Sequence, residues 1–155
     1  MSDIQLYDQN LTGQITMPPG AYRAPTSTVV QYATPVYVSG PGIVGAAKAD
    51  AAGTSLVVGL SCREVDVAGG NTYVTPTSGL VDFPTQIWDG VTGQTGGLTP
   101  GSAYYLSAAT VGKLTTTAPS GGADFIVLIG IARDPTTIIL NISFVPSPAP
   151  VSIIE

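Results

Sequence analysis

The chain has 155 residues, enough for one domain with a substantial hydrophobic core. Only 10 % of the residues are charged, against about 25 % in ordinary soluble domains, and the formal net charge is −5. Such a surface is short of solubilising groups, which indicates that part of it is buried between subunits. The five basic residues are scattered along the sequence, so none of them forms a cluster that could neutralise a nucleic-acid backbone. We therefore expect no nucleic-acid partner.

The sequence also lacks the signals that direct a chain to a membrane. The N-terminal residues have neither the charged nor the apolar region of a secretory signal. No apolar run approaches the roughly 20 residues of a membrane-spanning helix. The single cysteine, Cys62, cannot form an intrachain disulfide. We expect no membrane partner, and synthesis in a cytoplasm.

Residues 1–34 predict an extended N-terminal arm. Prolines interrupt it and exclude a continuous helix, while its apolar residues are irregularly spaced. Such an arm would lie on a neighbouring subunit or on the domain itself, with strand addition to a sheet edge as its mode of contact. The alternative is an ordinary first strand with an irregular lead-in. The residues predicted to make intermolecular contacts are Ile4, Leu6, Tyr7, Leu11, Ile15 and Tyr22.

Residues 35–145 predict an all-β domain, either a single β-barrel or a β-sandwich. The only helix-favouring stretch is residues 45–53, where alanines lie between two glycines and allow one or two turns. Residues 146–155 predict an extended, proline-rich tail. Strands are expected at residues 36–39, 56–61, 64–67, 71–75, 80–83, 86–91, 104–107, 114–117, 125–131 and 138–144.

The clearest strand pattern lies between residues 97 and 145. Pro100 and Gly101 suit the two central positions of a tight turn, and Gly112 suits a hairpin connection. Apolar and polar residues alternate over 138–144, with Ile138, Leu140, Ile142 and Phe144 on one face. The run 125–131 is apolar on both faces. It is therefore either a central core strand or a strand with one face against a partner chain.

The sequence also contains an internal similarity, here called the internal echo, in which two short motifs recur 68 to 71 residues later in the chain. Val-Tyr-Val-Ser at 36–39 resembles Tyr-Tyr-Leu-Ser at 104–107, and each is followed by a glycine turn. Val-Val-Gly-Leu at 57–60 likewise resembles Leu-Ile-Gly-Ile at 128–131. The pattern predicts two pseudo-repeated halves within one domain. The alternative is chance similarity among strands rich in glycine and valine.

No residue pattern predicts catalysis. The chain has no histidine, which excludes Ser-His-Asp and Cys-His arrangements and histidine-based zinc sites. Cys62 follows an apolar run and is expected to be a core residue. A two-carboxylate hydrolase would have to draw on Asp66, Asp82, Asp89 and Asp124, yet Asp89-Gly90 and Asp134-Pro135 are typical of turns. We expect no enzymatic activity, no catalytic residue, no metal and no cofactor.

Aromatic residues leave one further possibility open. Trp88, Tyr104 and Tyr105, together with Tyr73, could form a platform that stacks against sugar rings or lies in a subunit interface. The alternative is that aromatic residues in strands belong to the core.

The order of motifs from residue 35 to 142 resembles phage virion proteins, namely capsid decoration (cement) proteins and tail-fibre-associated modules. The resemblance covers about two thirds of the chain and leaves out the arm and the tail. The motifs that carry it are Val-Tyr-Val-Ser at 36–39, Ala-Lys-Ala-Asp-Ala-Ala-Gly-Thr-Ser at 47–55, Val-Val-Gly-Leu at 57–60, Pro-Thr-Ser-Gly-Leu-Val at 76–81, Gly-Leu-Thr-Pro-Gly-Ser-Ala-Tyr-Tyr-Leu-Ser at 97–107 and Gly-Lys-Leu-Thr-Thr-Thr-Ala-Pro at 112–119.

The resemblance implies a non-enzymatic homotrimer that binds the major capsid protein on the outer surface of the capsid and stabilises the shell. Such a protein is made in the host cytoplasm and ends in the virion. The alternative implied function is a tail-fibre or capsid-fibre module that binds host-surface glycans.

Overall fold

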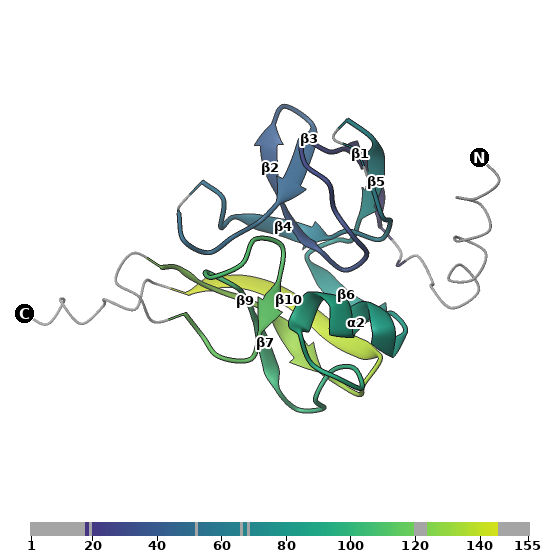
Figure 1. Cartoon of the computed structure of the whole chain (residues 1–155), viewed down its shortest axis with the longest axis vertical. Helices are drawn as coiled ribbons and strands as arrows, with labels where there is room; N and C mark the ends of the chain where they lie inside the picture. Colours follow the sequence, from purple (N-terminus) through teal and green to yellow (C-terminus); the bar gives the residue numbers. More distant parts are fainter. Residues whose placement is uncertain are drawn as a thin grey trace, which may run out of the picture.

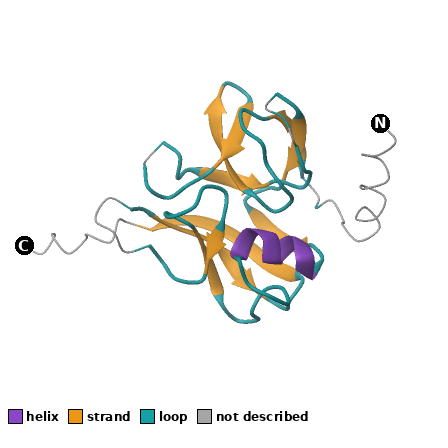
Figure 2. Ribbon diagram, viewed as in Figure 1, coloured by secondary structure: helices purple, strands orange, loops and turns teal. Residues whose placement is uncertain are grey.

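The computed structural model describes residues 18, 20–51, 53–65, 67, 69–119 and 124–145, and the statements below concern these residues. The fold is all-β, as predicted, with antiparallel sheets and one short helix, α2 (Thr85–Thr92), among the described residues (Figures 1 and 2). The strands are β1 (Tyr22–Pro25), β2 (Pro35–Gly40), β3 (Ile43–Ala46), β4 (Val57–Leu60), β5 (Asn71–Val74), β6 (Ser78–Asp82), β7 (Ala103–Leu106), β8 (Leu114–Thr115), β9 (Ile126–Ala132) and β10 (Thr137–Val145).

The strands form three sheets. The largest has five strands in the order β6-β10-β9-β7-β8, the second has the order β3-β2-β4, and β1 pairs with β5. None of the described sheets closes into a barrel, so the predicted barrel alternative is wrong. The main core lies on one face of the five-stranded sheet, where α2 and residues of the first half, including those of β4, cover it. A smaller core lies within the first half.

The five-stranded sheet confirms the strand pattern predicted for residues 97–145. Strand β9 is central, because it pairs with β10 on one side and with β7 on the other. Ile138 and Leu140 of β10 are buried as predicted. Phe144 is half exposed instead, and it lies beyond an irregularity in the pairing between Leu140 and Ser143 near the end of the strand. Ile142 is partly buried and packs against the main core, so the predicted alternation holds from Ile138 to Ile142 and fails at Phe144.

Both predicted turns of this region are present. The Thr99 carbonyl oxygen accepts a hydrogen bond from the Ser102 backbone N–H at 3.1 Å, and Gly101 between them has φ +84°. A positive φ at the third position is what a type II turn requires, and glycine adopts it without steric cost. Gly112, in the connection between β7 and β8, has φ +72°. Local residue chemistry is therefore enough to place these two reversals of the chain.

The connection between β9 and β10 is held by the carboxylate of Asp134. Its Oδ1 atom accepts hydrogen bonds from the backbone N–H groups of Thr136 at 3.0 Å and Thr137 at 2.9 Å, and Oδ2 lies 3.2 Å from Nε of Arg133. The Thr136 backbone hydrogen bond, with help from the other donors, lowers the pKa of Asp134 to about 2. The turn role predicted for Asp134-Pro135 is confirmed.

We expect Asp134 to make stability depend on pH in the acid range. The pKa of the folded state lies below the ordinary aspartate value, so the contribution is complete above about pH 4 and is lost as pH falls through about 2. Melting temperatures of the native protein and of Asp134→Asn, measured between these limits, should therefore converge as pH falls. A constant difference between the two proteins would contradict this role.

Two local predictions are wrong, and each has a packing reason. Residues 86–91, predicted as a strand, belong to helix α2, which follows Pro84 and ends at Gly93 with φ +77°. The helix turns Trp88 and Val91 into the core. Residues 45–53, predicted as a helix, contribute their first two residues to β3 and continue without helix in the described part. The backbone N–H groups of Ala47 and Ala49 donate instead to the distant carbonyl oxygens of Pro35 and Ser107, each at 2.9 Å.

The two halves of the chain repeat one arrangement of strands, as the internal echo predicts. Strand β2 lies between β3 and β4, and β7 lies between β8 and β9, with every pairing antiparallel. The β2–β4 and β7–β9 pairings each have an irregularity in register, beside Gly59 and Gly130 respectively. In both positions an added Cβ would collide with a backbone carbonyl of the following segment. The echo therefore reflects shared backbone geometry.

The later part of the predicted N-terminal arm belongs to the folded domain. Strand β1 pairs with β5 over four residues, and Val30 and Val65 form an isolated bridge. Val30 and Ala33 are buried. The alternative of an ordinary first strand therefore applies to residues 21–34, while residues 1–17 lie outside the described residues. The strand predicted at 64–67 is reduced in the described part to the bridge at Val65.

Candidate interaction surface

Most of the predicted arm contacts cannot be placed. Ile4, Leu6, Tyr7, Leu11 and Ile15 lie outside the described residues. Tyr22 is described: it begins β1, pairs with Val74 and leaves 44 % of its surface exposed. Its ring is therefore available to a partner, at the start of the strand that joins the arm to the domain.

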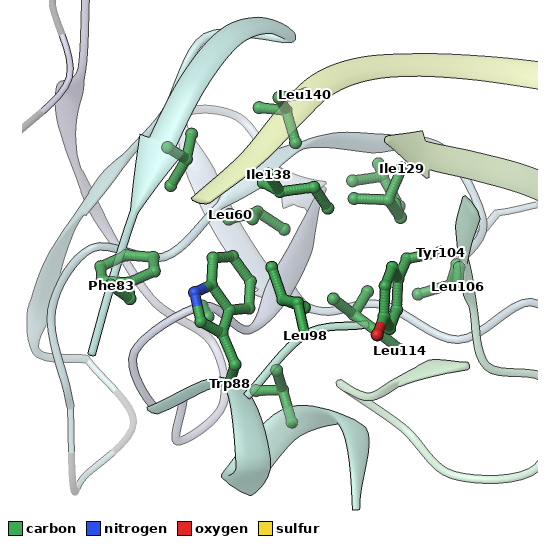
Figure 3. Close-up of a cluster of buried hydrophobic side chains, with 14 of the residues drawn as sticks. Leu60, Phe83, Trp88, Leu98, Tyr104, Leu106, Leu114, Ile129, Ile138 and Leu140 are labelled. Atoms are coloured by element: carbon green, nitrogen blue, oxygen red, sulfur yellow. The ribbon is translucent and has the colours of Figure 1, made fainter. Parts of the chain in front are cut away.

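Two of the three predicted aromatic contact residues are core residues. Trp88 and Tyr104 are fully buried, and Figure 3 shows both among the aliphatic side chains of the main core. The expectation that they face a glycan or another subunit is corrected, because neither ring reaches the surface. The core alternative considered for them holds. Their burial follows from the helix that carries Trp88 and from the inward face of β7 that carries Tyr104.

Each buried aromatic residue has its polar atom satisfied. Trp88 donates from Nε1 to the Thr136 carbonyl oxygen at 2.8 Å, and its ring makes an edge contact with Phe83 at a centroid distance of 5.3 Å. The Tyr104 hydroxyl accepts from the Thr99 backbone N–H at 2.8 Å and donates to Oε1 of Gln94. Buried rings with paired polar atoms stabilise the fold, and they link α2 and the 94–99 loop to the sheet.

The remaining predicted aromatic residue, Tyr105, lies on the opposite, outer face of the five-stranded sheet. It is partly exposed and is paired with Leu128 of β9 and Thr115 of β8. Successive side chains of a strand point to opposite faces, so Tyr105 faces away from Tyr104 and Leu106, which are buried. Tyr105 thus remains a candidate interface residue.

The outer face of this sheet carries a row of apolar side chains that runs across four strands. The pairing registers place Leu80 of β6 beside Ile139 of β10, Ile139 beside Ile131 of β9, and Ile131 beside Ala103 of β7. We call these four residues the outer stripe. Leu80, Ile139 and Ile131 leave 53 %, 45 % and 46 % of their surfaces exposed. The sequence predicted apolar residues on both faces of β9, but not this alignment across the sheet.

The outer stripe is costly to leave in water. Complete burial of a leucine or isoleucine side chain contributes about 1.5 to 3 kcal/mol, so burying the exposed half of each contributes on the order of 1 kcal/mol. Three such residues lie in one row, next to the partly exposed Leu128 and Tyr105. A contiguous apolar patch of this kind is typical of an interaction surface.

Polar residues border the outer stripe on two sides. Towards the β9–β10 turn, the next row contains the exposed residues Asp82 and Arg133 with the buried Thr137 between them. Thr137 pairs with Asp82, and its carbonyl oxygen accepts a hydrogen bond from the Arg133 backbone N–H at 2.9 Å. In the other direction, Ser78 pairs with Asn141. An apolar centre with a polar edge is the usual composition of a protein–protein interface.

Of the candidate carboxylates and the cysteine, Asp89 and Cys62 have structural roles, and Asp66 lies outside the described residues. Asp89 lies in α2 and accepts hydrogen bonds from the backbone N–H groups of Gly96 and Gly97, so the turn predicted at Asp89-Gly90 is wrong. Cys62 is buried, and burial raises the pKa of its thiol to about 12, as expected of a core residue. Among the described residues, no three acidic, cysteine or histidine side chains are grouped in a way that could hold a metal ion.

Two open hollows flank the short edge strand β8, with volumes of about 300 and 370 Å³. Most of their lining residues are small or carry a hydroxyl group, and both hollows share Ser107 and Thr115. One charged residue lines each hollow, Asp124 in the first and Lys113 in the second. Neither has an aromatic ring in its lining. They therefore lack the stacking surface on which the glycan hypothesis depends.

No helix among the described residues is long and apolar enough to cross a membrane. A scan of protein-family models gives no match to the chain, and a search of curated proteins gives no significant relative.

Proposed function

We propose that this protein is a phage virion structural protein, a capsid decoration (cement) protein that binds the outer capsid surface as a homotrimer and stabilises the shell. Its partners are the major capsid protein and further copies of itself. It acts without catalysis and without a cofactor, and it reaches the virion after synthesis in the host cytoplasm. The resemblance of its motif order to phage β-modules is the starting point for this proposal.

The observation that supports the proposal most is the outer stripe. A chain with only 10 % charged residues exposes three large aliphatic side chains in one row of a five-stranded sheet. Such a surface favours a protein that functions within an assembly, because association removes the apolar area from water.

Stabilisation of the shell would follow from multivalent binding. Three linked subunits raise the effective concentration of each capsid contact after the first one forms, so modest individual contacts give a long-lived complex. A clamp that spans neighbouring capsid proteins then opposes their separation. The apolar N-terminal arm supplies the capsid contacts in this proposal.

The alternative, a fibre module that binds host glycans, has less support. It depended on a platform of Trp88, Tyr104 and Tyr105, and the first two are fully buried. Tyr105 alone offers one partly exposed ring. Binding to host cells or glycans, with none to capsids, would favour this alternative.

The proposed function is tested by co-sedimentation of the purified protein with undecorated phage capsids. We expect saturable binding, and capsids that resist heating better when the protein is bound. Absence of binding at every concentration tested would contradict the capsid function. Capsids that already carry their decoration protein serve as the control, since their sites are occupied and additional binding should be small.

Deletion of residues 2–17 should abolish capsid binding without unfolding the domain. This deletion retains β1, whereas one that continued through Pro25 would remove β1 and uncover the edge of β5. Circular dichroism checks folding, and co-sedimentation measures binding. As a matched variant of full length, serine replaces each apolar contact residue of the arm, namely Ile4, Leu6, Tyr7, Leu11 and Ile15. Unchanged affinity in both variants would move the docking site to the β-domain.

A further inference from the structure

The outer stripe lies on the sheet face opposite the main core. On the core side, the sheet is covered by α2 and by residues of the first half of the chain. On the outer side, the described part of the chain leaves the central residues Ile131 and Ile139 nearly half exposed. They belong to β9 and β10, two inner strands of the sheet, which are labelled in Figure 1. The apolar area left exposed therefore lies on inner strands of the sheet and not at one of its edges.

We propose that the outer stripe, Leu80–Ile139–Ile131–Ala103, is the surface through which copies of this chain associate. This inference rests on the proposed function for the number of copies, three, and on the structure for the face that they bury. Ile131 and Ile139 form the centre of the contact, and Leu128 and Tyr105 extend it across β9 and β7.

The time at which the outer stripe would be buried favours another copy of this chain, and not the capsid, as the partner that covers it. A surface for the capsid stays in water from folding until docking, whereas a subunit contact is buried as soon as the chains meet. Aliphatic residues in the middle of a sheet, with few charges elsewhere to maintain solubility, fit a contact that forms early and persists. In the proposed function the N-terminal arm makes the capsid contacts, so the outer stripe is not needed for them.

Charge at the border of the stripe is compatible with self-association. The row beside it contains Asp82 at one end and, at the other, Arg133, which pairs with Asp134 of its own chain, so both signs of charge occur along this border. The stripe itself has no charged residue. For a chain with net charge −5, this is a surface on which like-charge repulsion between copies is small.

The first test compares masses in solution by light scattering, without capsids. The unaltered protein should have a mass of about 47 kDa, three times the 15.7 kDa of one chain. Ile139→Glu and Ile131→Glu should each reduce this to the mass of a single chain, because a carboxylate cannot remain charged in a dry apolar contact. Val38→Glu is the matched control. Val38 is a β-branched strand residue of β2, 53 % exposed and outside the stripe, so this variant should keep the full mass.

Several results would overturn the inference. These are a single-chain mass for the unaltered protein or full-size assemblies of both stripe variants. A mass of two chains that both stripe variants reduce to one would overturn the number of copies in the proposed function and leave the assignment of the face standing. Dissociation caused by Val38→Glu alone would place the contact on the other half of the chain. Circular dichroism confirms that each variant is folded before its mass is interpreted.

A second measurement avoids charged substitutions altogether. Ile139→Cys and Val38→Cys each introduce a thiol, and their reaction rates with a maleimide are compared in the assembled protein. Cys62 contributes little background, because it is buried and its pKa is raised to about 12. The thiol at position 139 should react at least tenfold more slowly than the thiol at position 38. Equal rates would overturn the inference.

Failure of this inference is distinguishable from failure of the proposed function. Mass and thiol protection are measured without capsids, and capsid binding is measured by co-sedimentation. A trimer that buries another surface and still binds capsids would overturn only the assignment of the outer stripe. A trimer that depends on the outer stripe but does not bind capsids would overturn only the capsid function.

Discussion

Replacement of Trp88 by alanine should reduce the free energy of unfolding by about 3 to 5 kcal/mol, the range for loss of a large buried aromatic side chain. Trp88 is fully buried, contacts Phe83 and donates a hydrogen bond to the Thr136 carbonyl oxygen. Domains of this size are stable by only about 5 to 15 kcal/mol, so the loss is a large part of the total. Urea unfolding followed by circular dichroism measures it.

Two control variants identify the source of the loss. Trp88→Phe retains a ring in the core and should lose less, about 1 to 3 kcal/mol, because the Phe83 backbone N–H still donates to the Thr136 carbonyl oxygen. Val29→Ala changes an exposed side chain and should stay within about 0.5 kcal/mol of the native protein. All samples are compared at one protein concentration, since association contributes to stability. An unchanged unfolding midpoint for Trp88→Ala would contradict the described core.

Replacement of Gly130 by alanine should have the second large effect, a loss of about 3 kcal/mol, at the upper end of the usual cost of overpacking. An added Cβ would collide with the carbonyl oxygen of Ile139 and lie 3.1 Å from the Leu140 Cα atom. These are backbone atoms of the paired strand β10, so no side-chain rotation relieves the collision. Because Ile139 belongs to the outer stripe, the variant should also weaken subunit association, which the solution mass would reveal.

Gly90→Ala provides a control of opposite sign. Gly90 is exposed in helix α2, and an added Cβ would meet no atom within 4 Å. Alanine is the better helix former, so this variant should gain about 0.5 to 1 kcal/mol. Equal effects of the two substitutions would show that glycine flexibility, and not the close approach of β10, determines the result at Gly130.

The turns and strands that were predicted correctly depend on local chemistry. Pro100 and Gly101 restrict the backbone to a tight turn whatever surrounds it, and Asp134 binds the backbone of its own turn. Alternation along β10 likewise places Ile138 and Leu140 in the core. These features were predictable because each depends on residues close in sequence.

Helix α2 was missed because its residues have mixed local preferences. Isoleucine, tryptophan, valine and threonine are all common in strands, and the eight residues are too few for a helical period to stand out. Tertiary packing decides the conformation: a helix turns Trp88 and Val91 together into the core, whereas a strand would place them on opposite faces. Pro84 before the helix and Gly93 after it were the available signals.

By itself, the sequence determined the all-β class, the positions of most strands, the duplicated halves and the shortage of charge, because these follow from residue type and short-range pattern. Only the tertiary structure decided which apolar residues are buried. Trp88 and Tyr104 are buried in the core. Leu80, Ile131 and Ile139 are no less apolar, but they lie side by side on the outer face. The reason is that sheet register places Leu80 beside Ile139, 59 positions later in the chain, and only the pairing of β6, β10 and β9 specifies that register.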